Sequence, residues 1–161
     1  MPIASIGVAT VMDGTYISNV DVIRFTRGVW REGDFSLPTV EIEINGESLR
    51  SLALTVELPQ AAAEGSPHLA GSYESLTVAD VHGRRTHFLG EPEATWFDDG
   101  DTVLLRCECG EWGCWPLTAQ ITVTDRTVTW SRFRHGHRDW DYGLLGPFVF
   151  DRTQYEDALQ I

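Results

Sequence analysis

Residues 39–46 read Thr-Val-Glu-Ile-Glu-Ile-Asn-Gly, an alternation of apolar and acidic side chains that ends in a turn dipeptide. Neighbouring side chains of a strand point to opposite faces. The pattern therefore predicts a half-buried strand, with Val40, Ile42 and Ile44 toward a core and the two glutamates toward water. The Asn-Gly dipeptide favours a turn and ends the strand.

The segment after this turn, residues 47–58, fits two patterns. From Leu52 onward the apolar residues alternate as in a strand, whereas Leu49, Leu52 and Val56 recur as on one face of a helix. A tight hairpin in register with residues 39–44 would place Leu49 in the core but would point Leu52 and Val56 away from it. We therefore favour a helix here.

From residue 86 onward the sequence predicts an antiparallel sheet. Short apolar or aromatic runs are separated by Asp-Gly and Asp-Arg dipeptides, as is typical of strands joined by turns. The runs lie at residues 87–89, 95–97, 103–105, 121–123 and 128–130.

The end of the chain predicts a short helix. Asp151, followed three residues later by Gln154, resembles a capping box, and Tyr155, Ala158 and Leu159 would share one face. The expected fold is therefore α+β, mainly an antiparallel β-sheet with one or two short helices that include a C-terminal helix.

Composition predicts one folded domain over residues 1–161. The chain has 42% hydrophobic and 11% aromatic residues, which is too rich in core-forming side chains for a disordered segment. No apolar run approaches the roughly 20 residues of a membrane span. The first residues lack the basic flank and apolar core of a signal peptide. We therefore expect a cytoplasmic protein without a membrane partner.

The net charge of the chain indicates which classes of binding partner to expect. The formal net charge is -12, with 24 acidic and 12 basic residues, and every basic residue is arginine. Such a field repels phosphate backbones, so we expect no nucleic-acid partner. The same field would attract a basic protein, although solubility alone also explains it.

All three cysteines lie within residues 107–114, Cys-Glu-Cys-Gly-Glu-Trp-Gly-Cys, between two apolar runs. If residues 110–113 form a hairpin loop, Cys109 lies opposite Cys114 on the paired strands. Cys107, two residues back, then shares their face, so the pattern predicts that three sulfurs converge.

Three interpretations of these cysteines stay open. As free thiols they would fill the sheet face beneath Trp96 and Trp130, since free cysteine is commonly buried. As zinc ligands they would need one more ligand, which His135 or His137 could supply, although the first two cysteines are closer together than in the usual zinc knuckle. As a redox pair they would need a lowered thiol pKa, which the glutamates nearby oppose.

Residues 135–142 read His-Gly-His-Arg-Asp-Trp-Asp-Tyr. In an extended conformation, one face would carry the histidines and aspartates and the other the arginine and aromatics. The first set is His135, His137, Asp139 and Asp141, and the second is Arg138, Trp140 and Tyr142. The first set could ligate a metal, as His-x-His does in cupin barrels, but the rest of that motif is missing. The alternatives are solvated ion pairs on a loop, or a binding surface formed by all seven residues, with the second set as its exposed anchors.

The C-terminal half resembles a small, uncharacterised bacterial protein family. The resemblance is carried by Phe88-Leu89-Gly90, Cys107-x-Cys109-Gly110, Gly113-Cys114-Trp115-Pro116-Leu117, Val128-Thr129-Trp130, Phe133, His137-Arg138, Trp140, Tyr142, Gly146-Pro147-Phe148, Phe150, Tyr155 and Ala158-Leu159. It implies an amphipathic helix near residues 49–56 and implies no activity.

No catalytic residue set emerges from these motifs. Ser131 precedes His135 without the glycine pattern of a nucleophile elbow, and a chain without lysine lacks the lysine of a phosphate-binding loop. We therefore expect a non-enzymatic, acidic protein-binding domain, comparable to inhibitor or immunity proteins, as a monomer or homodimer and without a required cofactor. The alternative is a zinc-binding protein, structural or hydrolytic, that uses the cysteine hairpin.

Overall fold

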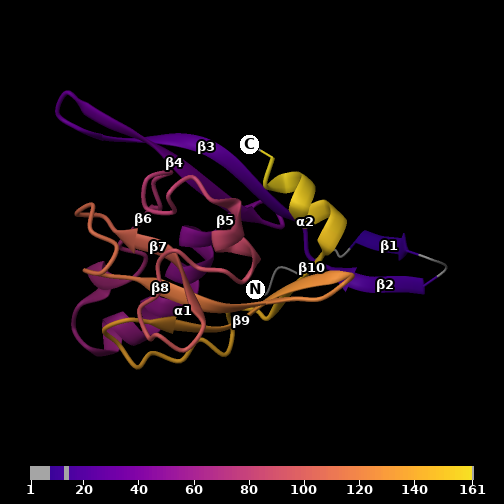
Figure 1. Ribbon diagram of the computed structural model, residues 1–161. Helices are drawn as coiled ribbons and strands as arrows, with labels where there is room; N and C mark the ends of the chain where they lie inside the picture. The colour runs from indigo at the N-terminus through magenta and orange to yellow at the C-terminus, as the bar shows by residue number, and fades with distance from the viewer. Residues whose placement is uncertain (1–7, 13–14, 161) are drawn as a thin grey trace.

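Antiparallel strands make up most of the fold, as the sequence predicts. The structure, a computed structural model, describes residues 8–12 and 15–160 (Figure 1). Its strands are β1 (Val8–Met12), β2 (Thr15–Val20), β3 (Ile23–Glu32), β4 (Phe35–Ile44), β5 (Glu47–Ser48), β6 (Tyr73–Ser75), β7 (Asp101–Cys107), β8 (Leu117–Val123), β9 (Thr127–His135) and β10 (Phe148–Asp151). Its helices are α1 (Leu49–Ala63), η1 (Pro67–Leu69), η2 (Arg85–Leu89) and α2 (Arg152–Ala158).

The strands form one large and two small sheets. The large sheet has the order β10-β9-β8-β7-β6, a second has the order β3-β4-β5, and β1 pairs with β2. A parallel bridge between Asp21 and Phe150 and an antiparallel bridge between Thr39 and Thr77 link the small sheets to the large one. The hairpin of β3 and β4 extends past β6 and β7 as an arm (Figure 1).

The turn after β4 and the helix α1 follow the predicted pattern. Asn45 and Gly46 have φ of 53° and 84°, the positive values that a two-residue hairpin turn favours. The pairing lasts only through β5, because Ser48 accepts a hydrogen bond at 3.1 Å from a backbone N–H of the next turn and caps α1. Leu49 and Ala53 are buried. The helix interpretation is therefore confirmed, and the helix continues beyond residue 58.

Two runs that we predicted as strands, 87–89 and 95–97, are not strands. The first forms η2, a 3-10 helix whose buried His87 ring lies 2.8 Å from the carbonyl oxygen of Val103. In the second, the N–H groups of residues 96 and 97 donate to the carboxylate of Asp101, so they are lost to any neighbouring strand. The other three runs lie within β7, β8 and β9, as predicted.

The C-terminal helix α2 forms as predicted and packs on β3. The Asp151 carboxylate accepts from the N–H of Gln154 at 3.0 Å. The Gln154 side chain does not complete the capping box, since it pairs with both backbone groups of Ile23.

Within the described residues, no helix is long and apolar enough to cross a membrane.

Aromatic side chains fill the core between α2 and the two larger sheets. Trp130, Phe150 and Tyr155 are fully buried, and the Phe25 ring lies 5.7 Å from that of Tyr155. The Tyr155 hydroxyl accepts from the Trp130 indole at 3.0 Å and donates to the Phe88 carbonyl at 2.6 Å. One hydroxyl therefore satisfies two buried polar groups.

Replacing Tyr155 by phenylalanine should lower the free energy of unfolding by about 2 kcal/mol, because a buried N–H and a buried carbonyl lose their partner. Urea unfolding of Tyr155→Phe measures this loss. In a Trp130→Phe background the same substitution should cost less, since the indole N–H is already absent. Equal losses in both backgrounds would contradict the bond between the two side chains.

Candidate metal centre

The connection between β7 and β8 folds back on itself and carries all three cysteines. Cys107 is the last residue of β7, and the ladder to β8 ends at the pair of Leu105 with Leu117. The N–H of Gly110 donates to the carbonyl of Cys107 at 3.0 Å, and that of Cys114 donates to the carbonyl of Glu111 at 3.2 Å. Two consecutive turns thus bring residues distant in the loop together.

These turns gather the three thiols. The sulfurs of Cys107, Cys109 and Cys114 lie within 4.8 Å of one another, and none of them is in a disulfide. With Zn–S bonds of about 2.3 Å, sulfurs of a tetrahedral zinc site stand about 3.8 Å apart. Small side-chain rotations would therefore convert this arrangement into three ligands of one ion.

Hydrogen bonds lower the pKa of one of the thiols. A backbone hydrogen bond from Glu111 and a side-chain bond from Cys107 lower the pKa of Cys109. Burial raises the pKa of Cys107 to about 12. The N–H of Cys109 also points at the Cys107 sulfur, 3.4 Å away. Of the two shifts, only that of Cys109 favours the thiolate, which is the form that binds metal.

A buried arginine fixes the loop from below. Arg106 is 2% exposed, and its guanidinium donates to the carbonyls of Ser75 and Gly110. It lies 3.8 Å from the Asp80 carboxylate and 4.9 Å from the centre of the Trp30 ring. The arm of β3 and β4 and the strand β6 therefore both hold the cysteine loop through one side chain.

Replacing Arg106 by methionine should lower the free energy of unfolding by about 3 kcal/mol, because Asp80 and two carbonyls lose their partner in a largely buried place. Urea unfolding checks this value. The matched control is Arg24→Met, since Arg24 lies 3.8 Å from Glu43 with 71% of its side chain exposed. The control should cost less than about 1 kcal/mol. Similar losses in both variants would contradict the structural role of Arg106.

The predicted geometry of the cysteines needs correction, although the sulfurs do converge. Cys109 and Cys114 do not face each other across a ladder, because the strands end before them. They also do not fill a sheet face beneath Trp96 and Trp130, since both are exposed and Cys107 is only half-buried. The backbone of the loop, and not packing in the core, brings the thiols together.

The two histidines that we predicted as the remaining ligand lie in different environments, and the first of them, His135, is buried. His135 ends β9 and is 2% exposed, with its Nδ1 accepting from the N–H of His137 at 2.9 Å. Its Nε2 has no partner within the described residues, and its ring packs 3.9 Å from that of Trp115. Burial, with the charges of His137 and Arg138, lowers the pKa of His135 to about 3. His135 is thus a neutral core side chain.

His137 lies beside the cysteine loop. It is exposed, and its Nε2 lies 3.1 Å from the carbonyl oxygen of Gly113, the residue before Cys114. Its ring packs edge-on against Trp96, with centroids 4.7 Å apart. His137 is not within 4.8 Å of all three sulfurs, but its contact with Gly113 places its ring beside the residue that precedes Cys114.

The rest of residues 135–142 docks on α1, and does not form the extended face that we predicted. A turn at residues 136–137 reverses the chain, so His135 forms a bridge with Arg138. Arg138 and Trp140 both bond to the carboxylate of Glu64 at the end of α1. The two aspartates, Asp139 and Asp141, are exposed.

Tyr142, which we predicted as an exposed anchor, is 7% exposed. Its hydroxyl donates to Glu57 in the middle of α1, and Tyr73 donates to the same carboxylate oxygen, each at 2.5 Å. The N–H of Gly71 donates to the other oxygen at 2.8 Å. Burial raises the pKa of Glu57, against the effect of these three bonds. Glu57 thus ties α1, β6 and the 135–142 segment together.

In comparisons with known proteins, no family model, no curated protein and no solved structure matches this chain. The family resemblance noted in the sequence therefore stays a prediction. What the protein does has to be inferred from its own residues.

Proposed function

We propose that this protein binds one zinc ion through the thiolates of Cys107, Cys109 and Cys114, and that the ion stabilises the loop between β7 and β8. The observation that carries the proposal is the convergence of three sulfurs to within 4.8 Å in a single loop. Burial of apolar surface does not account for it, because two of the thiols are exposed. Coordination of a thiophilic ion accounts for all three positions.

The surroundings of the thiols support the proposal. Zinc binding to cysteine releases a proton, so it is favoured where one thiol already has a lowered pKa, as Cys109 has. Arg106 fixes the backbone of the loop at Gly110 without using a sulfur. The ligands are therefore held near one another before the ion binds, which lowers the entropic cost of binding.

We assign the remaining coordination position to His137. Neutral imidazole completes many three-cysteine zinc sites, and the His137 ring already lies against the carbonyl of Gly113. His135 is a poorer choice because its ring is buried and its Nδ1 accepts the His137 N–H. With four protein ligands the shell is closed, so we propose a structural and not a hydrolytic ion.

Cobalt(II) titration tests the proposal, because cobalt takes the tetrahedral sites of zinc but is coloured. Protein freed of metal should bind one cobalt ion with thiolate charge-transfer bands, and zinc should displace it. In Cys109→Ser these bands should lose about a third of their intensity and cobalt should bind more weakly, because two of the three thiolates remain. The control Glu108→Gln, an exposed side chain between two of the ligands, should keep them. Bands of undiminished intensity and unchanged affinity in Cys109→Ser, or bands that never form in the wild type, would refute the proposal.

His137→Gln tests the histidine by itself. It should keep the thiolate bands but weaken cobalt binding by about tenfold, since one of four ligands is lost while three thiolates stay. Unchanged binding in His137→Gln would mean that solvent or another group fills this position.

A further inference from the structure

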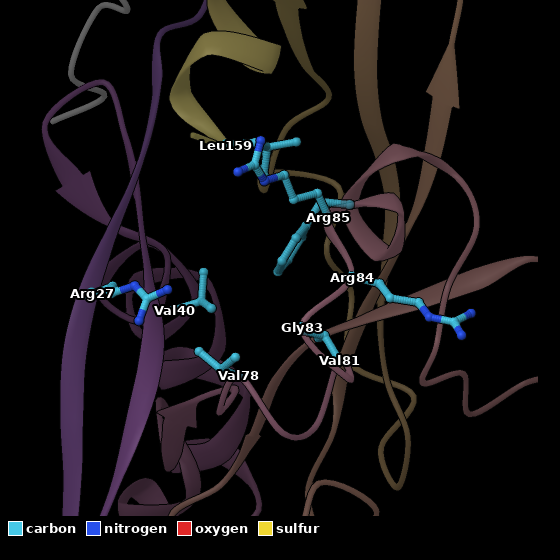
Figure 2. A pocket seen from close by; sticks show the side chains of 9 residues that line it. Arg27, Val40, Val78, Val81, Gly83, Arg84, Arg85 and Leu159 are labelled. Carbon is cyan, nitrogen blue, oxygen red and sulfur yellow. The ribbon is translucent and has the colours of Figure 1, made fainter. Parts of the chain in front are cut away.

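A pocket lies between the arm of β3 and β4, the segment around residues 78–85 and the end of α2 (Figure 2). Its volume is about 140 Å³. The apolar part of its lining consists of Val40, Val78, Val81, Phe88 and Leu159, and the rest includes three arginines, Arg27, Arg84 and Arg85. The pocket shares no residue with the cysteine loop, so it is independent of the zinc proposal.

Arg27 occupies a position where the strand pattern calls for an apolar residue. It follows the buried Ile23 and Phe25 at two-residue spacing, so it points to the same face of β3 as they do. Across the ladder it lies opposite Val40, which is 5% exposed. On the other face, by contrast, Arg24 lies opposite Glu43 and pairs with it at 3.8 Å.

Two of the three arginines have no acidic partner. Arg84 bonds to Glu93 at 3.1 Å, and Figure 2 shows its side chain directed away from the pocket. Arg27 and Arg85 lie on opposite sides of the pocket in the same view. Within the described residues, neither side chain makes a hydrogen bond or an ion pair, and both residues are exposed. Because both side chains reach solvent, each can turn toward a ligand that enters the pocket from solvent.

We infer that this pocket binds a small aryl carboxylate. An apolar cavity of about 150 Å³ holds one benzene ring, and this pocket has about 140 Å³. The ring would lie against the valines and Phe88, while the carboxylate would pair with the guanidinium groups of Arg27 and Arg85, whose planar N–H groups match carboxylate oxygens. Inorganic phosphate would leave the apolar lining unused, and a neutral aromatic molecule would leave the two charges unpaired.

Benzoate is the probe that tests this inference. Titration of isotope-labelled protein should shift the methyl signals of Val40, Val78 and Val81 in NMR spectra. The dissociation constant should rise about tenfold in Arg27→Gln, and likewise in Arg85→Gln, since each removes one charge-assisted contact. Arg24→Gln, on the opposite face of the same strand, should bind as the wild type does. The same spectra show that each variant is folded.

Three results would overturn the inference. The first is a titration in which the valine methyl signals do not move. The second is equal affinity for benzoate in the wild type, Arg27→Gln and Arg85→Gln. The third is equal affinity of the wild type for benzoate and for benzyl alcohol, because the alcohol offers the ring without the charge. Each of these results leaves the cobalt titration of the cysteine loop unaffected, so the two proposals fail separately.

Discussion

Replacing Glu57 by alanine is expected to lower the free energy of unfolding by about 4 kcal/mol, because three buried donors lose their acceptor at once. The donors are the hydroxyls of Tyr73 and Tyr142 and the N–H of Gly71. Glu57 is itself fully buried, so no solvent reaches the gap. Urea unfolding of Glu57→Ala against the wild type measures the loss.

The matched control is Glu64→Ala, which removes the same side chain at the end of the same helix. Glu64 bonds to Arg138 and Trp140, but 35% of its side chain is exposed. Water can therefore replace these contacts, and the loss should stay below about 1 kcal/mol. If both variants lost the same amount, the cluster around Glu57 would not be the link between α1, β6 and residues 135–142.

The raised pKa of Glu57 also predicts how stability depends on pH. In the unfolded chain the carboxyl loses its proton near its ordinary pKa of 4.5, whereas burial keeps the proton in the folded protein to higher pH. In that window the folded state binds more protons, so stability falls as pH rises. The stabilisation is complete below the ordinary pKa and is lost as pH rises through the folded value.

Glu57→Gln isolates this contribution, because the amide keeps the size of the side chain and does not titrate. Unfolding curves from about pH 4 to about pH 7 should show the wild type losing stability relative to Glu57→Gln as pH rises. A constant difference between the two proteins across this range would show that Glu57 does not titrate with a raised pKa.

Removal of the proposed zinc ion is the second change with a large expected effect. A ligand that binds only the folded state at about 1,000 times its dissociation constant adds about 4 kcal/mol of stability. For a chain of this size, that corresponds to a fall in Tm of about 10 °C on chelation. Calorimetry with and without a chelator measures the shift.

Cys109→Ser should melt at the temperature of the chelated wild type and should not respond to chelator. The control Glu108→Gln should melt, and respond to chelator, as the wild type does. An identical Tm for the wild type with and without chelator would contradict a stabilising ion, whatever the behaviour of the variants.

The sequence predicted correctly those helices, strands and turns that depend on residues close together in the chain. The alternation at residues 39–44, the Asn-Gly turn and the apolar face of α1 depend on spacing within a few residues. The strand predicted at 95–97 was wrong because the Asp101 carboxylate takes up its backbone donors. The strand predicted at 87–89 was wrong because this run belongs to a 3-10 helix, in which the N–H of His87 donates to the carbonyl of Arg84. Single-strand patterns do not show such side-chain competition.

The candidate site was predicted in composition but not in geometry. The hairpin that we assumed for residues 107–114 predicted that the sulfurs converge, but the two turns that bring them together in the structure were not visible in the sequence. The Glu57 cluster was missed altogether. A signal for it existed, because Glu57 follows the buried Leu49 and Ala53 at four-residue spacing on the apolar face of α1.

Recognition of a basic protein, which the net charge suggested, stays a prediction. Of the seven residues that we assigned to a binding surface, His135 and Tyr142 are buried, and Arg138 and Trp140 are engaged with Glu64. A single domain over residues 1–161 and a monomeric or homodimeric state likewise stay predictions. A pull-down at low and at high salt would test the charge-driven partner, since screening weakens such binding.

The proposed zinc site is tested most directly by native mass spectrometry. The protein is produced in cells grown with added zinc and is purified without an affinity metal. The account predicts a mass that includes one zinc ion and falls to that of the bare chain with chelator, after which three free thiols are counted under denaturing conditions. A bare mass that does not change when zinc is added, or a mass reduced by the hydrogens that a disulfide removes, would contradict the zinc site at Cys107, Cys109 and Cys114.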